Sequence, residues 1–212
     1  MIFRLAPDIA FPNPALAEED GLLAIGGDLS EERLMLAYQN GIFPWFDDES
    51  PILWYSPHQR FVLFPNELRI SKSMRQILNA NRFKITLNTA FNKVIKACAE
   101  TKRTDQNGTW ITTEMQLAYL NLHLSGHAHS VEVWDQDELV GGLYGVQINK
   151  VFCGESMFSS QSNASKCALI WLCTQGNFEL IDCQIHSDHL GKLGAKMIER
   201  EEFNSYLKAE KT

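Results

Sequence analysis

The stretch VFCGESMFSSQSNASKCALIWLCTQGNFELIDCQIHS, residues 151–187, contains the pattern that decides the fold. Runs rich in β-forming residues at 151–153 and 180–185 predict two strands. Helical spacing of apolar residues over 164–173 predicts a helix between them. Strand, helix and strand in this order are typical of a crossover connection within one sheet. The stretch therefore predicts an α/β core.

Polar side chains follow or interrupt both predicted strands. Glu155 comes just after the first strand, and Asp182 and Gln184 lie inside the second. An unpaired charge is costly to bury, so each carboxylate needs a partner or a task. Residues i and i+2 of a strand share a face, which predicts that Asp182 and Gln184 point the same way. A carboxylate beside an amide can accept and orient an N–H group, which suits chemistry on an amine. The alternatives are an Asp182 that fixes a loop at a strand end and a Glu155 paired with a nearby basic residue.

The rest of the chain predicts a mixed fold with a small N-terminal part. Residues 1–60 are rich in turns, with a helix after Ser30 that ends at Gly41, and we expect a domain boundary near residue 60. Residues 61–212 form the second domain. We expect strands at 60–64 and 83–87, a hairpin of 129–134 with 138–146, and a final turn at 189–190. We also expect helices at 71–79, at 90–102, capped by Thr89, and at 113–124, capped by Thr112. This order favours an α/β (α+β) fold on a largely antiparallel sheet.

Composition sets limits on the function. The 212 residues are 45% hydrophobic, and no stretch approaches the roughly 18–20 apolar residues of a membrane span. The five cysteines are odd in number and form no C-x-x-C pair, and the N-terminus lacks the apolar core of a secretory signal, so we expect reduced thiols in the cytoplasm. The net charge of −7 argues against broad nucleic-acid binding. A local basic cluster is either a nucleic-acid contact or a solvated helix surface: Arg69, Lys72, Arg75, Arg82 and Lys84.

Several ordered motifs give the chain a specific resemblance. They extend from about residue 11 to residue 203, and any one of them would be weak alone. The main runs are Gly21-Leu22-Leu23-Ala24-Ile25-Gly26-Gly27-Asp28-Leu29, Gly41-Ile42-Phe43-Pro44-Trp45-Phe46, Thr109-Trp110-Ile111-Thr112, Gly141-Gly142-Leu143-Tyr144-Gly145-Val146, Gly154-Glu155-Ser156-Met157-Phe158-Ser159, Asn163-Ala164-Ser165-Lys166 and Leu180-Ile181-Asp182-Cys183-Gln184. With these motifs the chain resembles the leucyl/phenylalanyl-tRNA–protein transferases.

The resemblance implies an aminoacyltransferase that moves leucine or phenylalanine (also methionine) from aminoacyl-tRNA to the α-amine of proteins that begin with Arg or Lys. The product would be marked for degradation by the N-end rule. The resemblance also implies a GNAT-like acyltransferase domain behind a small N-terminal domain, with no metal, no coenzyme, no DNA and no membrane partner. The expected partners are the 3′ end of aminoacyl-tRNA and the acceptor protein.

The resemblance also implies roles for particular residues. Asp182 and Gln184 match the catalytic pair, and Glu155 with Asp182 would hold the acceptor's cationic side chain or act in catalysis. Tyr38 and Trp45 match aromatic residues near the terminal adenosine. For Tyr38 and Tyr119 the helical spacing by itself favours the alternative, a position in the core. Pocket positions are matched by Trp110, Tyr119, Leu143, Phe152 and Leu172, and contacts to the tRNA acceptor stem by Lys72, Arg75, Arg82 and Lys84. The chain departs from the family at Arg69, where a His is usual, and at Ser187, an active-site position where an Asn is usual.

Two other functions fit a similar fold. An acyl-CoA-dependent N-acetyltransferase would need a phosphate-cradling turn, and Gly191-Lys192-Leu193-Gly194-Ala195 lacks the spacing. The net charge of −7 and the absence of a known RNA-binding motif weigh against a non-catalytic RNA-binding module. Five histidines, at 123, 127, 129, 186 and 189, lack the spacing of a zinc site, so no metal is expected.

Overall fold

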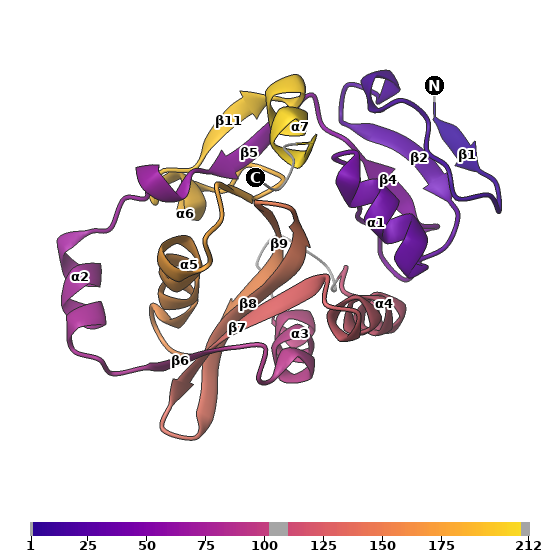
Figure 1. The fold of residues 1–212 in the computed structure, drawn as a ribbon. Coiled ribbons are helices and arrows are strands. Elements are labelled where there is room, and N and C mark those ends of the chain that lie inside the picture. Colours follow the sequence, from indigo (N-terminus) through magenta and orange to yellow (C-terminus); the bar gives the residue numbers. More distant parts are fainter. Residues whose placement is uncertain (1, 102–109, 209–212) are drawn as a thin grey trace.

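The computed structural model describes residues 2–101 and 110–208 of the chain. The strands of this part form two sheets, a small one from the N-terminal residues and a large one from the rest (Figure 1). Helices pack on both faces of the large sheet, which confirms the α+β prediction. No helix in the described ranges is long and apolar enough to cross a bilayer.

The small sheet lies within the first 55 residues, with strand order β1-β2-β4-β3. Its strands are β1 (Phe3–Leu5), β2 (Leu22–Gly26), β3 (Phe43–Pro44) and β4 (Leu53–Tyr55), with the short 3-10 helix η1 (Pro14–Leu16) before β2. Helix α1 (Glu31–Gln39) begins after Ser30, whose hydroxyl accepts the Arg33 amide, and ends before Gly41 in the left-handed conformation. Both ends of α1 therefore lie where the sequence predicts them.

The large sheet has the strand order β11-β5-β10-β9-β8-β7-β6. Its strands are β5 (Gln59–Leu63), β6 (Lys84–Leu87), β7 (Ala128–Asp135), β8 (Glu138–Ile148), β9 (Val151–Ser159), β10 (Leu180–Asp182) and β11 (Lys196–Glu199). All neighbours are antiparallel except β9 and β10, which are parallel and joined by α5 (Ala164–Gln175). The crossover that residues 151–187 predict is thus present.

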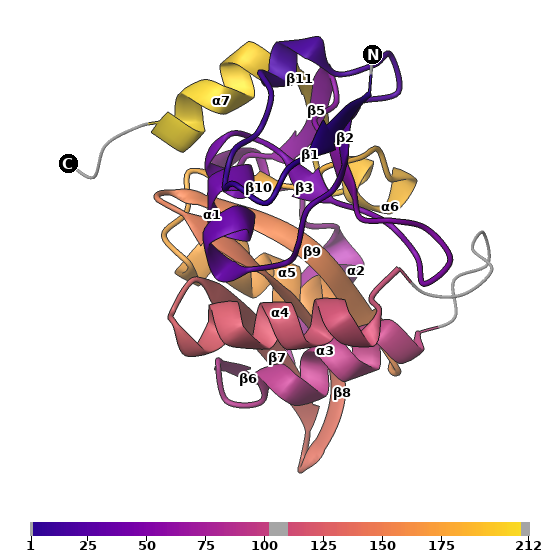
Figure 2. The same ribbon diagram turned by 90° about the vertical axis from the view of Figure 1, so that its right-hand side faces the viewer.

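Two hydrophobic clusters cover the two faces of the large sheet. On one face, α3 (Phe91–Glu100) and α4 (Thr113–Leu124) pack with α1 and the small sheet around Tyr144 and Val146. On the other, α5 packs against Leu143 and Phe152. Figure 2 shows α3 and α4 crossing in front of β7, β8 and β9. The first cluster continues from the small sheet into the large one, so the two sheets share a core, and the predicted boundary near residue 60 stays a prediction.

Some predicted elements differ in detail. Thr112 caps α4 as expected, since its hydroxyl accepts the Met115 amide. Thr89 does not cap α3: its hydroxyl donates to Glu132, and Ala90 occupies the cap position. The end of the helix predicted at 90–102 lies outside the described residues, and α3 ends at Glu100.

The C-terminal prediction was incomplete. The short helix α6 (Asp188–Gly191) lies at the predicted turn, but β11 and α7 (Arg200–Lys208) follow it. Both elements are short, and β11 alternates weakly because only its Ile198 is buried. Helix α2 (Lys72–Asn79) and the 3-10 helix η2 (Pro65–Glu67) complete the fold. The five cysteines form no disulfide within the described ranges, and four of them are buried.

Candidate active site

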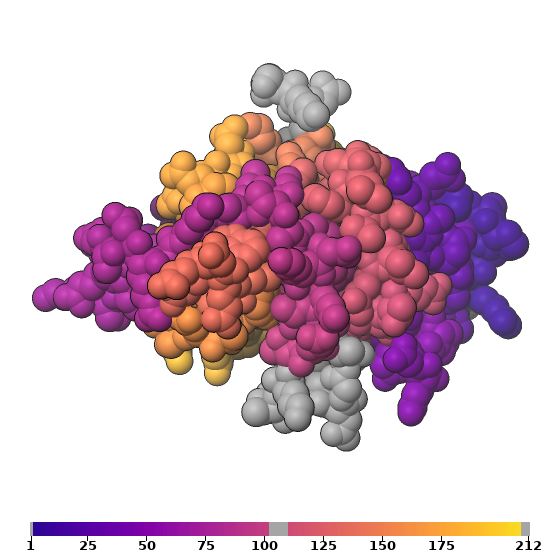
Figure 3. All heavy atoms as spheres, turned by 90° about the horizontal axis from the view of Figure 1, so that it is seen from below, coloured from indigo at the N-terminus to yellow at the C-terminus, as the bar shows by residue number. Residues whose placement is uncertain are grey.

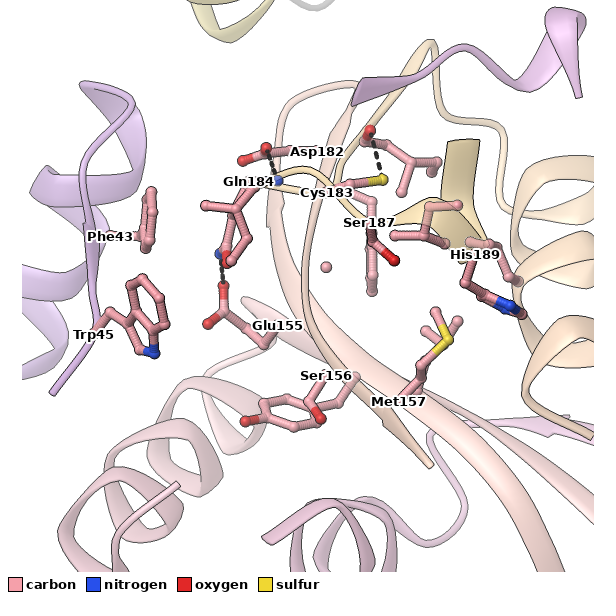
Figure 4. Close-up of a pocket in the computed structure, with 18 of the residues that line it drawn as sticks. Phe43, Trp45, Glu155, Ser156, Met157, Asp182, Cys183, Gln184, Ser187 and His189 are labelled. Atoms are coloured by element: carbon pink, nitrogen blue, oxygen red, sulfur yellow. Dashed lines mark hydrogen bonds between the residues drawn. The ribbon is translucent and has the colours of Figure 1, made fainter. Parts of the chain in front are cut away.

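A cavity of about 390 Å³ opens where β9 and β10 separate. The two strands pair only as far as Asp182 and Cys153, and β9 then continues to Ser159 with β8 as its only partner strand in the described residues. The small sheet closes one side of the opening with Phe43, Pro44 and Trp45 (Figure 4). The remaining wall is mostly apolar and comes from β8, β9, β10, α5 and α6: Leu143, Phe152, Met157, Leu169, Leu172, Ile181, His189 and Leu190.

Glu155 reaches the rim of this cavity because β9 carries a bulge. Tyr144 of β8 pairs with Ser156 and Gly145 pairs with Gly154, so Glu155 is the one extra residue. A bulge bends its strand and redirects the side chain that it carries. The sequence placed Glu155 just after the strand, whereas in the structure it lies within β9 at the cavity. Glu155 is only 7% exposed.

Gln184 reaches the same rim from the other strand. Strand β10 ends at Asp182, two residues before Gln184. Gln184 adopts φ +63°, a left-handed conformation that a non-glycine residue seldom takes. The prediction that Asp182 and Gln184 share a strand face is therefore wrong, because the chain turns between them. The turn directs the Gln184 amide to Glu155, and Nε2 donates to Oε1 at 2.7 Å.

The buried carboxylate of Glu155 is held by two donors. Besides Gln184, the Tyr119 hydroxyl donates to Oε2 at 2.9 Å. Burial raises the pKa of Glu155 to about 7, although these hydrogen bonds favour its charged form. Among the described residues, no cation lies within ion-pair distance of Glu155, so the alternative of a paired structural carboxylate is not observed. A carboxyl group that titrates near neutral pH beside a cavity is suited to accept a proton.

Asp182 lies behind Gln184 and away from free solvent. Its oxygens accept from Arg60 at 2.8 Å each, and Oδ1 also accepts the Gln184 amide N–H at 2.8 Å. The side chain is fully buried. Asp182 belongs to the residues around the cavity, but both of its oxygens are engaged by Arg60 and by the Gln184 backbone, and the role that the resemblance implies for it stays a prediction.

Tyr38 and Tyr119 lie in the core, as their helical spacing favours, and not at the substrate positions that the resemblance implies. Both rings are buried at 1% exposure or less, and neither lines the cavity. The two hydroxyls are hydrogen-bonded to each other, and the Tyr119 hydroxyl in turn donates a hydrogen bond to Glu155. We therefore assign them to holding Glu155 rather than to contacting a substrate. The cavity does include the other predicted substrate residues: Trp45, Trp110, Leu143, Phe152, Leu172 and Ser187.

Replacing Tyr119 by phenylalanine is expected to raise the pKa of Glu155 further. The substitution removes a donor that stabilises the ionised form, and hydrogen bonds to charged groups contribute roughly 1.5–3 kcal/mol, equivalent to about one to two pH units. If Glu155 must be ionised, the acid limb of the kcat–pH profile then moves to higher pH, and the loss is largest below pH 7. Tyr206→Phe on α7 is the control. An unmoved acid limb in Tyr119→Phe would separate Tyr119 from the function of Glu155.

The predicted tRNA-binding residues lie together but away from the small sheet. Lys72 and Arg75 are exposed on α2, which stands out at the end of the molecule opposite the small sheet (Figures 1 and 3). Lys84 is exposed on β6. Arg82 is already bound to Asp135 at 3.0 Å and to Gln161 at 2.6 Å. The cluster is a solvated cationic surface of which one member is partly neutralised.

Sequence reasoning missed several residues that line the cavity, among them Phe43 and Met157, and it missed Arg60 behind the rim. Phe43 belongs to a quoted motif but was not singled out, and it forms the wall nearest to Gln184. Arg60 gave no signal, since an arginine at the start of a strand is usually solvated, whereas here it is 2% exposed. Within the described ranges, no group of three or more His, Cys, Asp or Glu side chains is placed to hold a metal ion.

An apolar cavity with a carboxylate and an amide at its rim is suited to an enzyme that transfers an apolar acyl group to an amine. The family model of the leucyl/phenylalanyl-tRNA protein transferase matches residues 62–208, and the model of its N-terminal domain matches residues 27–58. The chain belongs to this family.

Curated relatives support the assignment over nearly the whole chain. The leucyl/phenylalanyl-tRNA–protein transferase of Flavobacterium psychrophilum is 55% identical over 207 residues, which cover 96% of this chain and 98% of the relative. That of Syntrophus aciditrophicus is 56% identical over 210 residues, 98% of this chain and 88% of the relative. Among solved structures, a GCN5-related N-acetyltransferase from Kribbella flavida matches 76% of this chain and 58% of its own at 10% identity, with a TM-score of 0.39. At that distance the GNAT-like fold stays a prediction.

Proposed function

We propose that the protein transfers leucine or phenylalanine from aminoacyl-tRNA to the N-terminal α-amine of a protein. Family membership supports the reaction. The observation that carries it is the meeting of Glu155 and Gln184 at the rim of an apolar cavity. Glu155 comes from β9 and Gln184 from the turn after β10. A buried carboxylate without a cationic partner is costly, so it is not expected in a core that serves stability alone.

The cavity is suited to the aminoacyl side chain. Leucine, phenylalanine and methionine present no polar atoms, and the walls around Leu143, Phe152 and Leu172 offer none that would need to be desolvated. A charged side chain would lose its hydration there without a partner. The cavity therefore selects apolar aminoacyl groups, and its shape decides among them.

Glu155 and Gln184 can then activate the amine. An ionised carboxylate only accepts hydrogen bonds, so Gln184 directs Nε2 to it and leaves Oε1 to accept an N–H of the incoming α-amine. The amine nitrogen attacks the ester carbonyl carbon, and Glu155 accepts the proton that the nitrogen loses. The carbon–oxygen ester bond to the tRNA ribose breaks, and the leaving ribose oxygen takes the proton that Glu155 accepted, which returns the carboxylate to its ionised form. The products are a new peptide bond and free tRNA.

We extend the proposal to acceptors that begin with Arg or Lys. Glu155 places negative charge at the rim, and an N-terminal residue with a cationic side chain would be attracted to it. Such products would enter N-end-rule degradation, as the resemblance implies. A tRNA substrate and thiols that remain reduced both suit the cytoplasm.

Transfer is tested with leucyl-tRNA and a peptide that begins with arginine, analysed by mass spectrometry. The expected result is a mass gain of one leucine residue at the N-terminus. An acetyl-blocked peptide is the control and should gain nothing. Acetylation of the peptide from acetyl-CoA instead would support the N-acetyltransferase alternative and overturn the proposal.

Raising salt is expected to weaken tRNA binding if the acceptor stem docks on α2. The double variant Lys72→Ala/Arg75→Ala should lower affinity and reduce the slope of log affinity against log salt by about one per lost phosphate contact. Filter binding of tRNA over a salt series measures both quantities. Lys93→Ala/Lys96→Ala, which removes two exposed lysines from α3, is the matched control. Equal slopes for the two double variants would reject α2 as the docking surface.

A further inference from the structure

Arg60 is a buried cation at the centre of several contacts. It lies on β5, and its guanidinium donates Nε to Oδ1 and Nη2 to Oδ2 of Asp182, both at 2.8 Å. Two aromatic rings enclose the guanidinium, Phe43 at 4.5 Å and Phe203 at 4.7 Å from ring centroid to Cζ. The remaining arm donates Nη1 to the Gly41 carbonyl at 3.2 Å. These contacts leave the planar fork little freedom to move.

The Arg60–Asp182 pair supports the turn that presents Gln184. The left-handed backbone of Gln184 is unfavourable for a residue with a side chain, so the surroundings must hold it in place. Asp182 does this by accepting a hydrogen bond from the backbone N–H of Gln184 at Oδ1. The Gln184 carbonyl also accepts the Phe61 amide at 3.3 Å, next to Arg60 on β5. A shift of Asp182 would therefore move the side-chain amide of Gln184 away from Glu155.

The other end of Arg60 reaches the small sheet. Gly41 ends the turn after α1, and Phe43 carries one wall of the cavity. Figure 4 shows Phe43 and Gln184 facing each other across the rim, with Glu155 beside them. Arg60 thus contacts the wall from the small sheet and, through Asp182, the turn from the large sheet. Its position fixes both sides of the rim relative to Glu155.

We propose that Arg60 is a positioning residue for aminoacyl transfer. It holds Asp182, which holds the backbone of Gln184 and thereby keeps the side-chain amide of Gln184 against Glu155. The inference rests on the proposed transfer reaction. Arg60 touches no substrate in this account, and its effect passes through Gln184. A lysine at the same position keeps the positive charge but cannot hold two oxygens in one plane.

Arg60→Lys tests the proposal against Arg200→Lys. Arg200 is a matched control because it is also buried, at 6% exposure, and donates to a backbone carbonyl, that of Ser56, away from the cavity. For Arg60→Lys we expect kcat to fall by at least tenfold while the KM for aminoacyl-tRNA changes by less than twofold. Arg200→Lys should leave both unchanged. Urea titrations of the two variants correct the rates for unfolded protein.

Two further measurements separate positioning from general damage. In a Gln184→Ala background, Arg60→Lys should add less than a twofold further loss, since the residue through which it acts is already gone. Hydrogen exchange of the Gln184 amide should accelerate in Arg60→Lys but not in Arg200→Lys, and this readout needs no activity.

Several outcomes would overturn the inference while transfer itself remains intact: a wild-type kcat in Arg60→Lys, additive losses in the double variant, or unchanged exchange at Gln184. Failure of the proposed function is a different result, because the wild-type protein would then transfer no leucine at all.

Discussion

Replacing Glu155 by glutamine is expected to lower kcat for transfer by about 10²–10⁴-fold. The substitution keeps the size of the side chain and an oxygen that can accept from Tyr119, but it removes the group that takes the proton. Because the pKa of Glu155 is raised to about 7, the wild-type rate should increase as pH rises through 7, and this limb should be absent in the variant. Single-turnover rates with preformed leucyl-tRNA over pH 6–9 measure both effects.

Glu132→Gln is the matched control for this prediction. Glu132 is also fully buried and bound by hydroxyl groups, those of Ser130, Thr86 and Thr89, but it does not line the cavity. Its substitution should leave kcat and the acid limb unchanged. Acceptors that begin with an uncharged residue distinguish recognition from catalysis: if Glu155 only binds a cationic side chain, Glu155→Gln will transfer to them as fast as the wild-type protein does.

Removing the carboxylate of Asp182 is expected to have the second large effect, on stability and rate together. Asp182→Ala leaves the Arg60 guanidinium buried without its counterion, which costs about 3–5 kcal/mol in the free energy of unfolding. It also removes the acceptor for the Gln184 amide. A misplacement of about 1 Å at a reacting group is enough to lower kcat by roughly 10²-fold. Urea unfolding and single-turnover rates, measured where the variant is folded, test both parts.

The affinity for tRNA provides the contrast. Asp182 lies behind Gln184 rather than on the α2 surface, so Asp182→Ala should bind tRNA nearly as tightly as the wild-type protein. Asp135→Ala, which breaks the exposed pair with Arg82, is the control and should change stability little. If tRNA affinity and transfer fall equally in Asp182→Ala, the residue has a structural role only.

The sequence predicted most elements that rest on local signals. The hairpin of β7 and β8, the crossover through α5 and the helix caps at Ser30 and Thr112 follow from periodicity and short-range hydrogen bonds. The predictions failed where local signals compete or are weak. Thr89 bonds to Glu132, 43 positions further along the chain, instead of capping α3, and β11 has a single buried residue to mark it.

Within the site, residue types were informative and geometry was not. Because a buried charge is costly, the sequence indicated that Glu155 and Asp182 each need a partner or a function. It predicted the same role for both, in catalysis or in binding the acceptor. The structure separates them, because Asp182 accepts from Arg60 and Glu155 does not. The bulge at Glu155 and the left-handed Gln184 have no reliable signature in a single sequence, and together they place the two side chains 2.7 Å apart.

The family motifs, the crossover over residues 151–187 and the capped helices could be recognised from residue types and from spacing along the chain. Three features follow only from the folded packing: Arg60 binds Asp182 and not Glu155, Tyr38 and Tyr119 support Glu155 from outside the cavity, and Arg60 joins the two sheets at the rim. The physical reason is distance along the chain. Arg60 and Asp182 are 122 positions apart, and Tyr38 and Tyr119 are 81 apart, so only the folded packing brings them together and determines which polar groups become partners.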